Sequence, residues 1–219
     1  MIRLHFKRAA ITFVNLIVFV VLFSCNKSNP SDPAATPVQS EKNKPTVNRE
    51  LLIKEVNRLK TIFATNDKDK IAGLFKFPIS DSIQIYTDND AYYKELKQND
   101  NKISKGMFLK YFEEISNDIQ IDQLNELFSH INTAGLLKQD KLKYENLIAT
   151  EPCYNFYEIE IKNDMVTLSV GSGSNENYKS EASGDEVAEN SSEICETVLW
   201  WIFRLTKGKL ELVTINGAG

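Results

Sequence analysis

The chain has 219 residues, with 26 Lys and Arg residues against 30 Asp and Glu residues and a formal net charge of −4. This acidic balance disfavours nucleic-acid binding, because neutralising phosphates requires clustered Lys and Arg. Only two histidines are present, His5 and His130, so a zinc site built from several histidines is excluded. We therefore expect no metal site, no cofactor and no nucleic-acid partner.

The first 24 residues have the pattern of an export signal. Arg3, Lys7 and Arg8 form a basic start without acidic residues, and a nearly unbroken apolar run follows over residues 9–23. This run is shorter than the roughly 20 apolar residues of a membrane-spanning helix. It ends in Leu22-Phe23-Ser24-Cys25, which resembles the lipobox of bacterial lipoproteins.

The lipobox resemblance implies cleavage before Cys25 and lipid attachment to its thiol, so the protein is expected on a membrane of a Gram-negative envelope, facing the periplasm or the outer surface. We expect a signal peptide over 1–24, a disordered tether over 25–46 and one folded domain over 47–219. The tether holds four of the chain's six prolines and has too few apolar residues to fold. Loss of the leader removes three basic residues, leaving 23 against 30 acidic ones, or about −7. The lipid, rather than a basic patch, is then the membrane anchor.

Cysteine usage predicts a disulfide in the folded domain. With Cys25 assigned to lipid, Cys153 and Cys195 remain as an even pair in an oxidising compartment. A bond between them would stabilise the folded state by about 3 to 4 kcal/mol on the chain-entropy model, because it closes a loop in the unfolded chain. The alternative is a reactive thiol pair, but the two cysteines lack the CxxC spacing that tunes such thiols.

Helices are predicted first along the domain. Asn48 begins a helix with a buried stripe at Leu52, Val56, Leu59 and Phe63. A short helix follows from Asp67 to Phe75, and an extended segment over 79–86. Ser104 begins a further helix through 115, and another spans 121–131 and includes His130, interpreted as a surface or core residue rather than a base. Residues 132–150 fit either a short helix or a strand.

Strands are predicted from Cys153 onward, where polar and apolar residues alternate. Asn163-Asp164 is a hairpin turn between this strand and 165–170, because both residues tolerate left-handed backbone. Residues 171–193 form a polar insert, 194–206 the longest strand, and Lys207-Gly208 the turn into 210–215. Helices followed by an antiparallel meander make an α+β fold.

This order resembles the NTF2-like superfamily, cone-shaped domains that include SnoaL-type cyclases and ketosteroid isomerases. The resemblance lies in Phe77-Pro78-Ile79, in the aromatic-rich segment 200–205 and in the following Gly208 to Leu212. It implies N-terminal helices packed on a curved antiparallel sheet, with a pocket between them. Enzymes of the family use an acid or histidine in that pocket, often with a tyrosine, but no catalytic residue of this chain matches by position.

Two groups of side chains are candidates for chemistry. Tyr157, Trp200, Trp201 and Phe203 either line an apolar pocket or pack as core, and the adjacent tryptophans must point to opposite faces of the sheet. Asp88 and Asp90 offer oxygen ligands for calcium or an acid–base pair, but they lack the glycine and distal glutamate of an EF-hand and are interpreted as solvated turn residues.

The leading hypothesis is a lipid-anchored envelope protein with a non-catalytic NTF2-like domain that binds a small apolar ligand or an envelope protein. One alternative is a small-molecule isomerase or hydrolase that uses a pocket carboxylate and a tyrosine. Another is a structural envelope protein that forms a homodimer through its sheet. The shortage of catalytic side-chain types favours the non-enzymatic hypothesis.

Overall fold

The computed structural model describes residues 48–79, 83–176, 178 and 195–219. The expected signal peptide, the lipobox with Cys25, the tether and most of the polar insert lie outside this part. Within it, the predicted order of helices followed by antiparallel strands is confirmed. No helix of the described ranges combines the length and apolar character needed to cross a bilayer.

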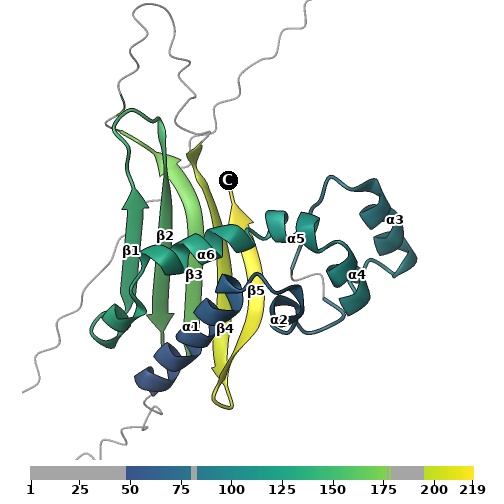
Figure 1. The fold of residues 1–219 in the computed structure, drawn as a ribbon, viewed down its shortest axis with the longest axis horizontal. Coiled ribbons are helices and arrows are strands. Elements are labelled where there is room, and N and C mark those ends of the chain that lie inside the picture. Colours follow the sequence, from purple (N-terminus) through teal and green to yellow (C-terminus); the bar gives the residue numbers. More distant parts are fainter. Residues whose placement is uncertain (1–47, 80–82, 177, 179–194) are drawn as a thin grey trace, which may run out of the picture. The chain divides into compact units, whose positions relative to one another are not determined.

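The helices and strands have the following bounds. The helices are α1 (Arg49–Ala64), α2 (Lys68–Ala72), α3 (Asp90–Gln98), α4 (Lys105–Lys110), α5 (Phe112–Asp118), α6 (Ile121–His130) and the 3₁₀ helix η1 (Thr133–Leu137). The strands are β1 (Lys141–Asn146), β2 (Cys153–Lys162), β3 (Met165–Ser174), β4 (Thr197–Thr206) and β5 (Lys209–Ala218). They pair in chain order as one antiparallel sheet, with α1 and α6 lying across one face and α3 to α5 grouped on the β5 side (Figure 1).

The first helix forms as its sequence predicts. The Asn48 side chain accepts a hydrogen bond from the Leu51 amide at 3.0 Å, which satisfies one of the free N–H groups at the start of α1. The predicted stripe of α1 faces the sheet and is buried: Leu52, Val56, Leu59 and Phe63. Removing this apolar stripe from water is the main reason that α1 stays on the sheet.

A buried carboxylate joins α1 to the last hairpin. Glu55, 6% exposed, accepts a hydrogen bond from the Leu210 amide at 3.0 Å, and Arg58 donates to the Leu210 carbonyl at 3.1 Å. Arg58 also donates to Glu55 at 2.8 Å, so the buried charge has a partner. The pair therefore fixes where β5 begins relative to α1.

The sheet has one core face and one outer face. On the core face Val166 pairs with Phe203 and Leu168 with Trp201, and all four side chains are fully buried. Both predicted hairpin turns are present, and Asn163 and Lys207 have φ angles of 57° and 50°, as tight turns between antiparallel strands require. The register therefore follows the alternation seen in the sequence.

Three helical predictions need correction. The helix expected from Asp67 to Phe75 ends at Ala72, and the helix expected from Ser104 is two helices that break at Tyr111. Tyr111 leaves helical geometry, and its buried ring packs against Tyr92 while its hydroxyl donates to Glu95 at 3.1 Å. Helix α3 was not predicted, because Tyr92 is its one buried residue and gives no apolar stripe.

The extended and ambiguous segments also differ in detail. The segment expected to be extended over 79–86 pairs only through a bridge between Ile79 and Ile103 in its described residues. Residues 132–150 contain both η1 and strand β1. The last predicted strands shift as well, since β3 continues to Ser174 and β4 begins at Thr197. The prediction that β4 is the longest strand is wrong, because β2, β3, β4 and β5 each have 10 residues.

Candidate functional site

The four aromatic residues considered for a pocket do not surround a common cavity. Tyr157, Trp201 and Phe203 lie on the core face and are at most 4% exposed, whereas Trp200 lies on the outer face. Trp201 packs edge-on against Phe63, and its indole N–H donates to the Ile119 carbonyl at 3.0 Å. Side chains therefore fill the space between the sheet and α1. A hollow of about 360 Å³ remains between the helices and the sheet, where α5 and α6 meet β2, β3 and β4, and it is lined by Ser116, Asn117, Gln120, Asp122, Gln123, Asn155, Gly171, Ser172 and Thr197.

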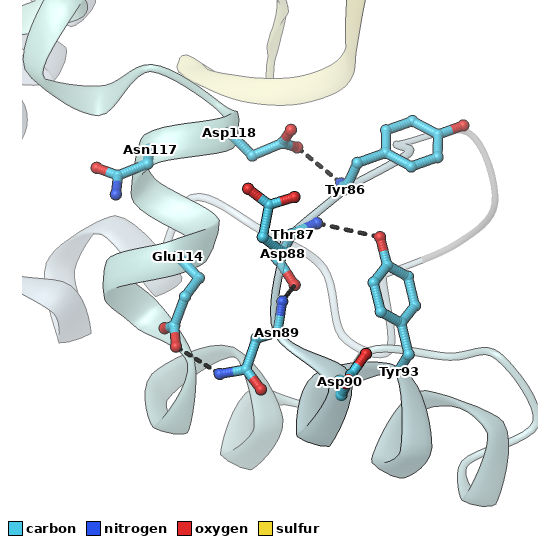
Figure 2. A pocket seen from close by; sticks show the side chains of 9 residues that line it. All are labelled: Tyr86, Thr87, Asp88, Asn89, Asp90, Tyr93, Glu114, Asn117 and Asp118. Carbon is cyan, nitrogen blue, oxygen red and sulfur yellow. Dashed lines mark hydrogen bonds between the residues drawn. The ribbon is translucent and has the colours of Figure 1, made fainter.

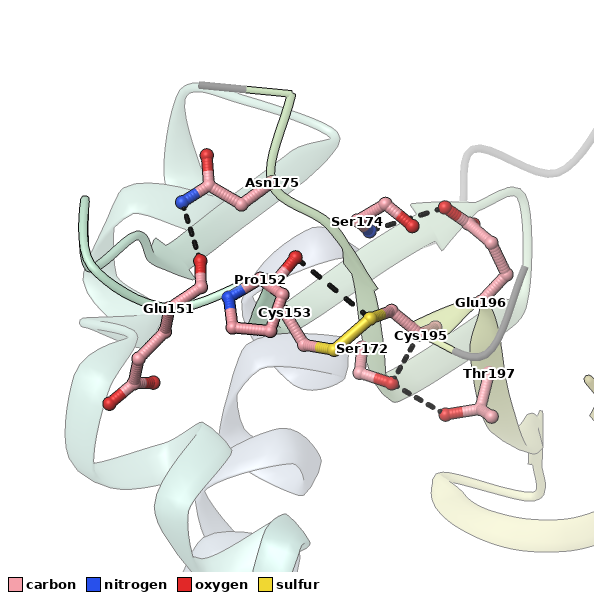
Figure 3. The surroundings of a disulfide bond; sticks show 9 residues. All are labelled: Glu151, Pro152, Cys153, Ser172, Ser174, Asn175, Cys195, Glu196 and Thr197. Atoms are coloured by element: carbon pink, nitrogen blue, oxygen red, sulfur yellow. Dashed lines mark hydrogen bonds between the residues drawn. A yellow bond between two sulfur atoms is a disulfide. The ribbon is translucent and has the colours of Figure 1, made fainter. Parts of the chain in front are cut away.

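Cys153 and Cys195 form a disulfide bond that joins the start of β2 to the residues just before β4 (Figure 3). Cys153 and Cys195 have Cα atoms 5.5 Å apart and are separated by 42 positions in the sequence. The Ser172 hydroxyl, on the intervening strand β3, donates to the Cys195 carbonyl and lies 2.8 Å from the Thr197 hydroxyl. The bond thus sits in a network that fixes the strand ends, as the structural interpretation predicts.

The candidate site lies instead in the helical region, which we define as residues 83–118 with α3, α4 and α5. A hollow of about 770 Å³ opens between the segment before α3 and helix α5 (Figure 2). We call it the acidic hollow. Its lining residues are Tyr86, Thr87, Asp88, Asn89, Asp90, Tyr93, Glu114, Asn117 and Asp118.

Hydrogen bonds from side chain to backbone hold the segment 86–89 in place. Asp118 accepts from the Tyr86 amide at 2.9 Å, and the Tyr93 hydroxyl accepts from the Thr87 amide at 3.2 Å. These bonds satisfy backbone donors that have no strand partner. The side chains that line the hollow therefore also fix the path of its wall (Figure 2).

Asn89 connects the two helices of the hollow. Its side-chain oxygen caps α3 by accepting from the Ala91 amide at 2.9 Å and the Tyr92 amide at 3.3 Å. Its side-chain nitrogen donates to Glu114 of α5 at 2.7 Å. One amide side chain thus satisfies the start of α3 and aligns it with α5.

The hollow is strongly acidic. Asp88, Asp90, Glu114 and Asp118 contribute carboxylates, and its lining contains no Lys or Arg. Asp88 and Asp90 are exposed as predicted, but Asp90 is the first residue of α3 rather than a turn residue, and Asp118 is half-buried. Burial raises the pKa of the Asp118 carboxyl above its ordinary value, and the hydrogen bond from the Tyr86 amide offsets part of that rise.

This arrangement favours ligands that carry positive charge or several hydrogen-bond donors, because carboxylates only accept when ionised. Among the described residues no group of three or more His, Cys, Asp or Glu side chains is placed to hold a metal ion. His130 lies outside the hollow, at the end of α6, where its ring stacks on Tyr144 with centroids 4.2 Å apart. A binding role for the hollow therefore rests on hydrogen bonds and charge.

Another hollow adjoins the acidic hollow where the helical region meets the sheet. It encloses about 510 Å³ and is lined by Gln84, Tyr86 and Asp118 together with residues at the ends of β4 and β5. Tyr86 and Asp118 belong to both hollows. The Tyr86 ring is 62% exposed, and its hydroxyl donates to Gln84 at 2.6 Å. Tyr86 is thus a large exposed side chain that a ligand on this surface can reach.

The sequence signal for this site was incomplete. The density of acids and tyrosines over residues 86–93 marks one wall, but Glu114 and Asp118 follow more than 20 positions later on another helix. The spacing of Glu114 and Asp118, four apart, places both on one helical face, which is the local signal that was available. Nothing in the sequence indicates which segment that face meets.

Comparisons with known proteins do not assign this chain to a family. No protein-family model, no curated protein and no solved structure shows a significant match to this chain.

Proposed function

We propose that this chain is a lipoprotein of a Gram-negative cell envelope, anchored by lipid on Cys25, with a non-catalytic NTF2-like domain that binds a small molecule or an envelope partner. The lipobox-like Leu22-Phe23-Ser24-Cys25 supports the anchor. The bond between Cys153 and Cys195 supports export independently, because disulfides persist in oxidising compartments. The order of helices before an antiparallel meander supports the NTF2-like assignment.

The observation that carries the binding role is the exposed ring of Tyr86 at the boundary of two hollows. Tyrosine combines a large apolar ring with a polar tip and is enriched where proteins contact partners. Asp118, Tyr93 and Asn89 are already bonded to backbone or side-chain groups that hold this surface. A rigid wall with one exposed aromatic residue suits the binding of a ligand, because binding gains from a surface whose shape is already fixed. It does not require a side chain that changes its protonation state.

Asp118 gives a specific reason to keep an enzymatic candidate. A carboxyl whose pKa is raised by burial, near tyrosine side chains, is a chemically suitable general base for an isomerase or hydrolase. This candidate predicts that purified protein exchanges the α-protons of a small ketone for deuterium, and that Asp118→Asn abolishes the exchange. Equal exchange rates with and without protein would leave the binding role as the better proposal.

The anchor is tested by mass spectrometry of the mature protein from the membrane fraction. We expect an amino-terminal Cys25 carrying acyl chains, and a Cys25→Ser variant that leaves the membrane fraction or retains its leader. Any other mature amino terminus, or an unacylated Cys25, defeats the proposed anchor.

The binding role is tested by native mass spectrometry of the full mature protein, purified from its own membranes in mild detergent. We expect an added mass that Tyr86→Ala loses. Leu137→Ala is the control, because it removes another exposed apolar side chain, 56% exposed, from η1. A mass retained by Tyr86→Ala, or lost equally from both variants, contradicts binding at the hollows.

A further inference from the structure

The hollow of about 360 Å³ where α5 and α6 meet the sheet has a wall of neutral polar side chains, and we call it the polar hollow. Seven of its nine lining residues carry a neutral hydroxyl or amide group: Ser116, Asn117, Gln120, Gln123, Asn155, Ser172 and Thr197. Among the described residues that line it, Asp122 is the one charged side chain and none is aromatic. Hydroxyl and amide side chains donate as well as accept, so the wall can pair with ligand groups that do both.

Ser116 brings a hydroxyl group to this hollow from inside α5. The residue is only 8% exposed, and its hydroxyl has no hydrogen-bond partner within the described part of the chain. Among the described side chains, the Tyr92 hydroxyl is the one polar group that is both completely enclosed and unpaired. The unpaired Ser116 hydroxyl is therefore not completely enclosed, and the polar hollow is the open space that Ser116 lines. A ligand there can pair a buried hydroxyl that the fold itself leaves unpaired.

Gln120, between α5 and α6, occupies a position where local rules favour other residues. Its φ of 56° lies in the left-handed region, which glycine and asparagine adopt more readily. It also stands at the start of α6 without capping that helix through its side chain, although Ser, Thr, Asp or Asn could do so. The Gln120 side chain instead lines the polar hollow and has no partner among the described residues. A role in binding explains a residue that suits its backbone poorly and lines a hollow.

Two sides of the polar hollow are already held in place. On the sheet, the Ser172 hydroxyl donates to the Cys195 carbonyl and lies 2.8 Å from the Thr197 hydroxyl. On α6, the Gln123 side-chain oxygen accepts from the Tyr157 hydroxyl at 3.0 Å, which leaves the nitrogen of that amide to donate to a ligand. A wall whose shape is fixed in advance loses little freedom when a ligand binds.

We propose that the polar hollow binds one neutral sugar ring, through hydrogen bonds between the sugar hydroxyls and the amide and hydroxyl side chains of the wall. Sugar hydroxyls both donate and accept, as these side chains do. An anionic ligand is disfavoured because the one charge of the described wall is the Asp122 carboxylate.

The size of the ligand follows from the volume of the hollow. A benzene ring occupies a cavity of about 150 Å³. A volume of about 360 Å³ therefore holds roughly twice as many heavy atoms, as in one hexose ring with its hydroxyl groups. This site is separate from the Tyr86 surface and goes beyond the binding role proposed there.

The test uses the methyl glycosides of glucose, galactose and mannose, in which the sugar stays a neutral ring. Their dissociation constants are measured by saturation-transfer NMR on the full mature protein in phosphatidylcholine nanodiscs, with empty nanodiscs subtracted. The methyl glycoside of glucuronic acid is the ligand control, because it adds one negative charge to the same kind of ring.

We expect at least one neutral glycoside to bind, and the glucuronide to bind at least about fivefold more weakly. Gln120→Gly and Ser116→Ala should each weaken the binding of the neutral glycoside about fivefold, because each removes one hydrogen-bonding group. Gln120→Gly should also unfold at the same or a higher temperature, since glycine adopts the left-handed backbone more readily. Asn125→Ala is the matched control and should bind as the wild type does, because it removes an exposed amide of α6 outside the wall.

Several results would overturn the proposal. Failure of every neutral glycoside to bind would show that water alone occupies the hollow. Wild-type affinity in Gln120→Gly or Ser116→Ala, equal binding of the glucuronide, or equal weakening by Asn125→Ala would show that the sugar lies elsewhere. A Gln120→Gly variant that melts several degrees lower would assign Gln120 to the fold rather than to a ligand.

These outcomes are distinguishable from those that test the proposed function. Tyr86 does not line the polar hollow, so Tyr86→Ala should bind the glycoside as the wild type does. Gln120→Gly should keep the added mass that Tyr86→Ala loses. An unacylated Cys25 would leave the affinity for the glycoside unchanged.

Discussion

The sheet with α1 and α6 differs from the helical region in what fills the space between its elements. Between the sheet and α1 the space is filled by rings, with Trp201 packed against Phe63 and stacked near Phe203. In the helical region the elements are joined by side chains that bond to backbone, and hollows remain between them. The sheet with α1 and α6 therefore supplies most of the buried apolar area that stabilises the fold. The helical region supplies surfaces that a ligand can reach.

This difference also changes where we expect a ligand to bind. The family resemblance predicts a ligand between sheet and helices, but aromatic side chains fill the space next to α1, and the hollow that remains lies where α5 and α6 meet β2, β3 and β4. The helices α3, α4 and α5 lie on the β5 side of the sheet (Figure 1). Asp118 and Ile119 line a hollow together with residues of β4 and β5. Just after the helical region, the Ile119 carbonyl accepts a buried hydrogen bond from the Trp201 indole of β4.

The largest predicted effect comes from Trp201, in the core of the sheet. Trp201→Ala should lower the free energy of unfolding by about 3 to 5 kcal/mol, because it leaves a large cavity and an unpaired carbonyl at Ile119. Urea unfolding followed by circular dichroism measures the loss. Trp200→Ala is the matched control, since its side chain is only partly buried on the outer face, and should cost less than half as much. Equal losses would contradict the assignment of core and outer faces.

A smaller effect should be confined to the helical region. Asn89→Ala removes the cap of α3 and the bond to Glu114, and should cost about 0.5 to 2 kcal/mol. Hydrogen exchange should show faster exchange of α3 amides while β3 and β4 are unchanged. Asn48→Ala, which removes the equivalent cap of α1, is the control. It should speed the exchange of amides in α1, the helix that faces the sheet. Faster exchange in β3 and β4 of Asn89→Ala would show that the two regions unfold as one unit.

The same comparison explains which parts of the fold could be predicted from sequence. In the sheet and in α1, the apolar period matches the burial, so Leu52 to Phe63 and the alternation around Ile159 identify the buried faces directly. The hairpin at Asn163 was predictable because its residues tolerate the backbone that the turn requires. Local pattern and tertiary packing agree in this region.

The helical region was less predictable because its order comes from contacts between distant residues. Helix α3 buries Tyr92 alone, so periodicity gives no signal, and its cap at Asn89 was hidden among the acids of residues 86–93. Tyr111 breaks a helix to reach Glu95 and Tyr92, which no local propensity indicates. The unpaired Tyr92 hydroxyl is likewise a property of the assembled fold.

The smallest predicted effect is a dependence on pH that arises in the helical region alone. Because burial raises the pKa of Asp118, the folded state binds its proton more tightly than the unfolded state does. Stability associated with that proton is therefore fully present below the unfolded-state pKa and is lost as the pH rises from there through the folded-state pKa. Asp118→Asn keeps an acceptor for the Tyr86 amide but carries no charge, so it should gain stability relative to the wild type as pH rises from about 4.

Urea unfolding at several values between about pH 4 and pH 8 measures this difference. Asp88→Asn is the control, because it removes an exposed carboxylate from the same hollow and should follow the wild-type curve. A wild type that becomes more stable than Asp118→Asn with rising pH would mean that the hydrogen bond from Tyr86 outweighs burial. In that case Asp118 would be ionised throughout, and its role would be to hold residue 86 in place rather than to share a proton with a ligand.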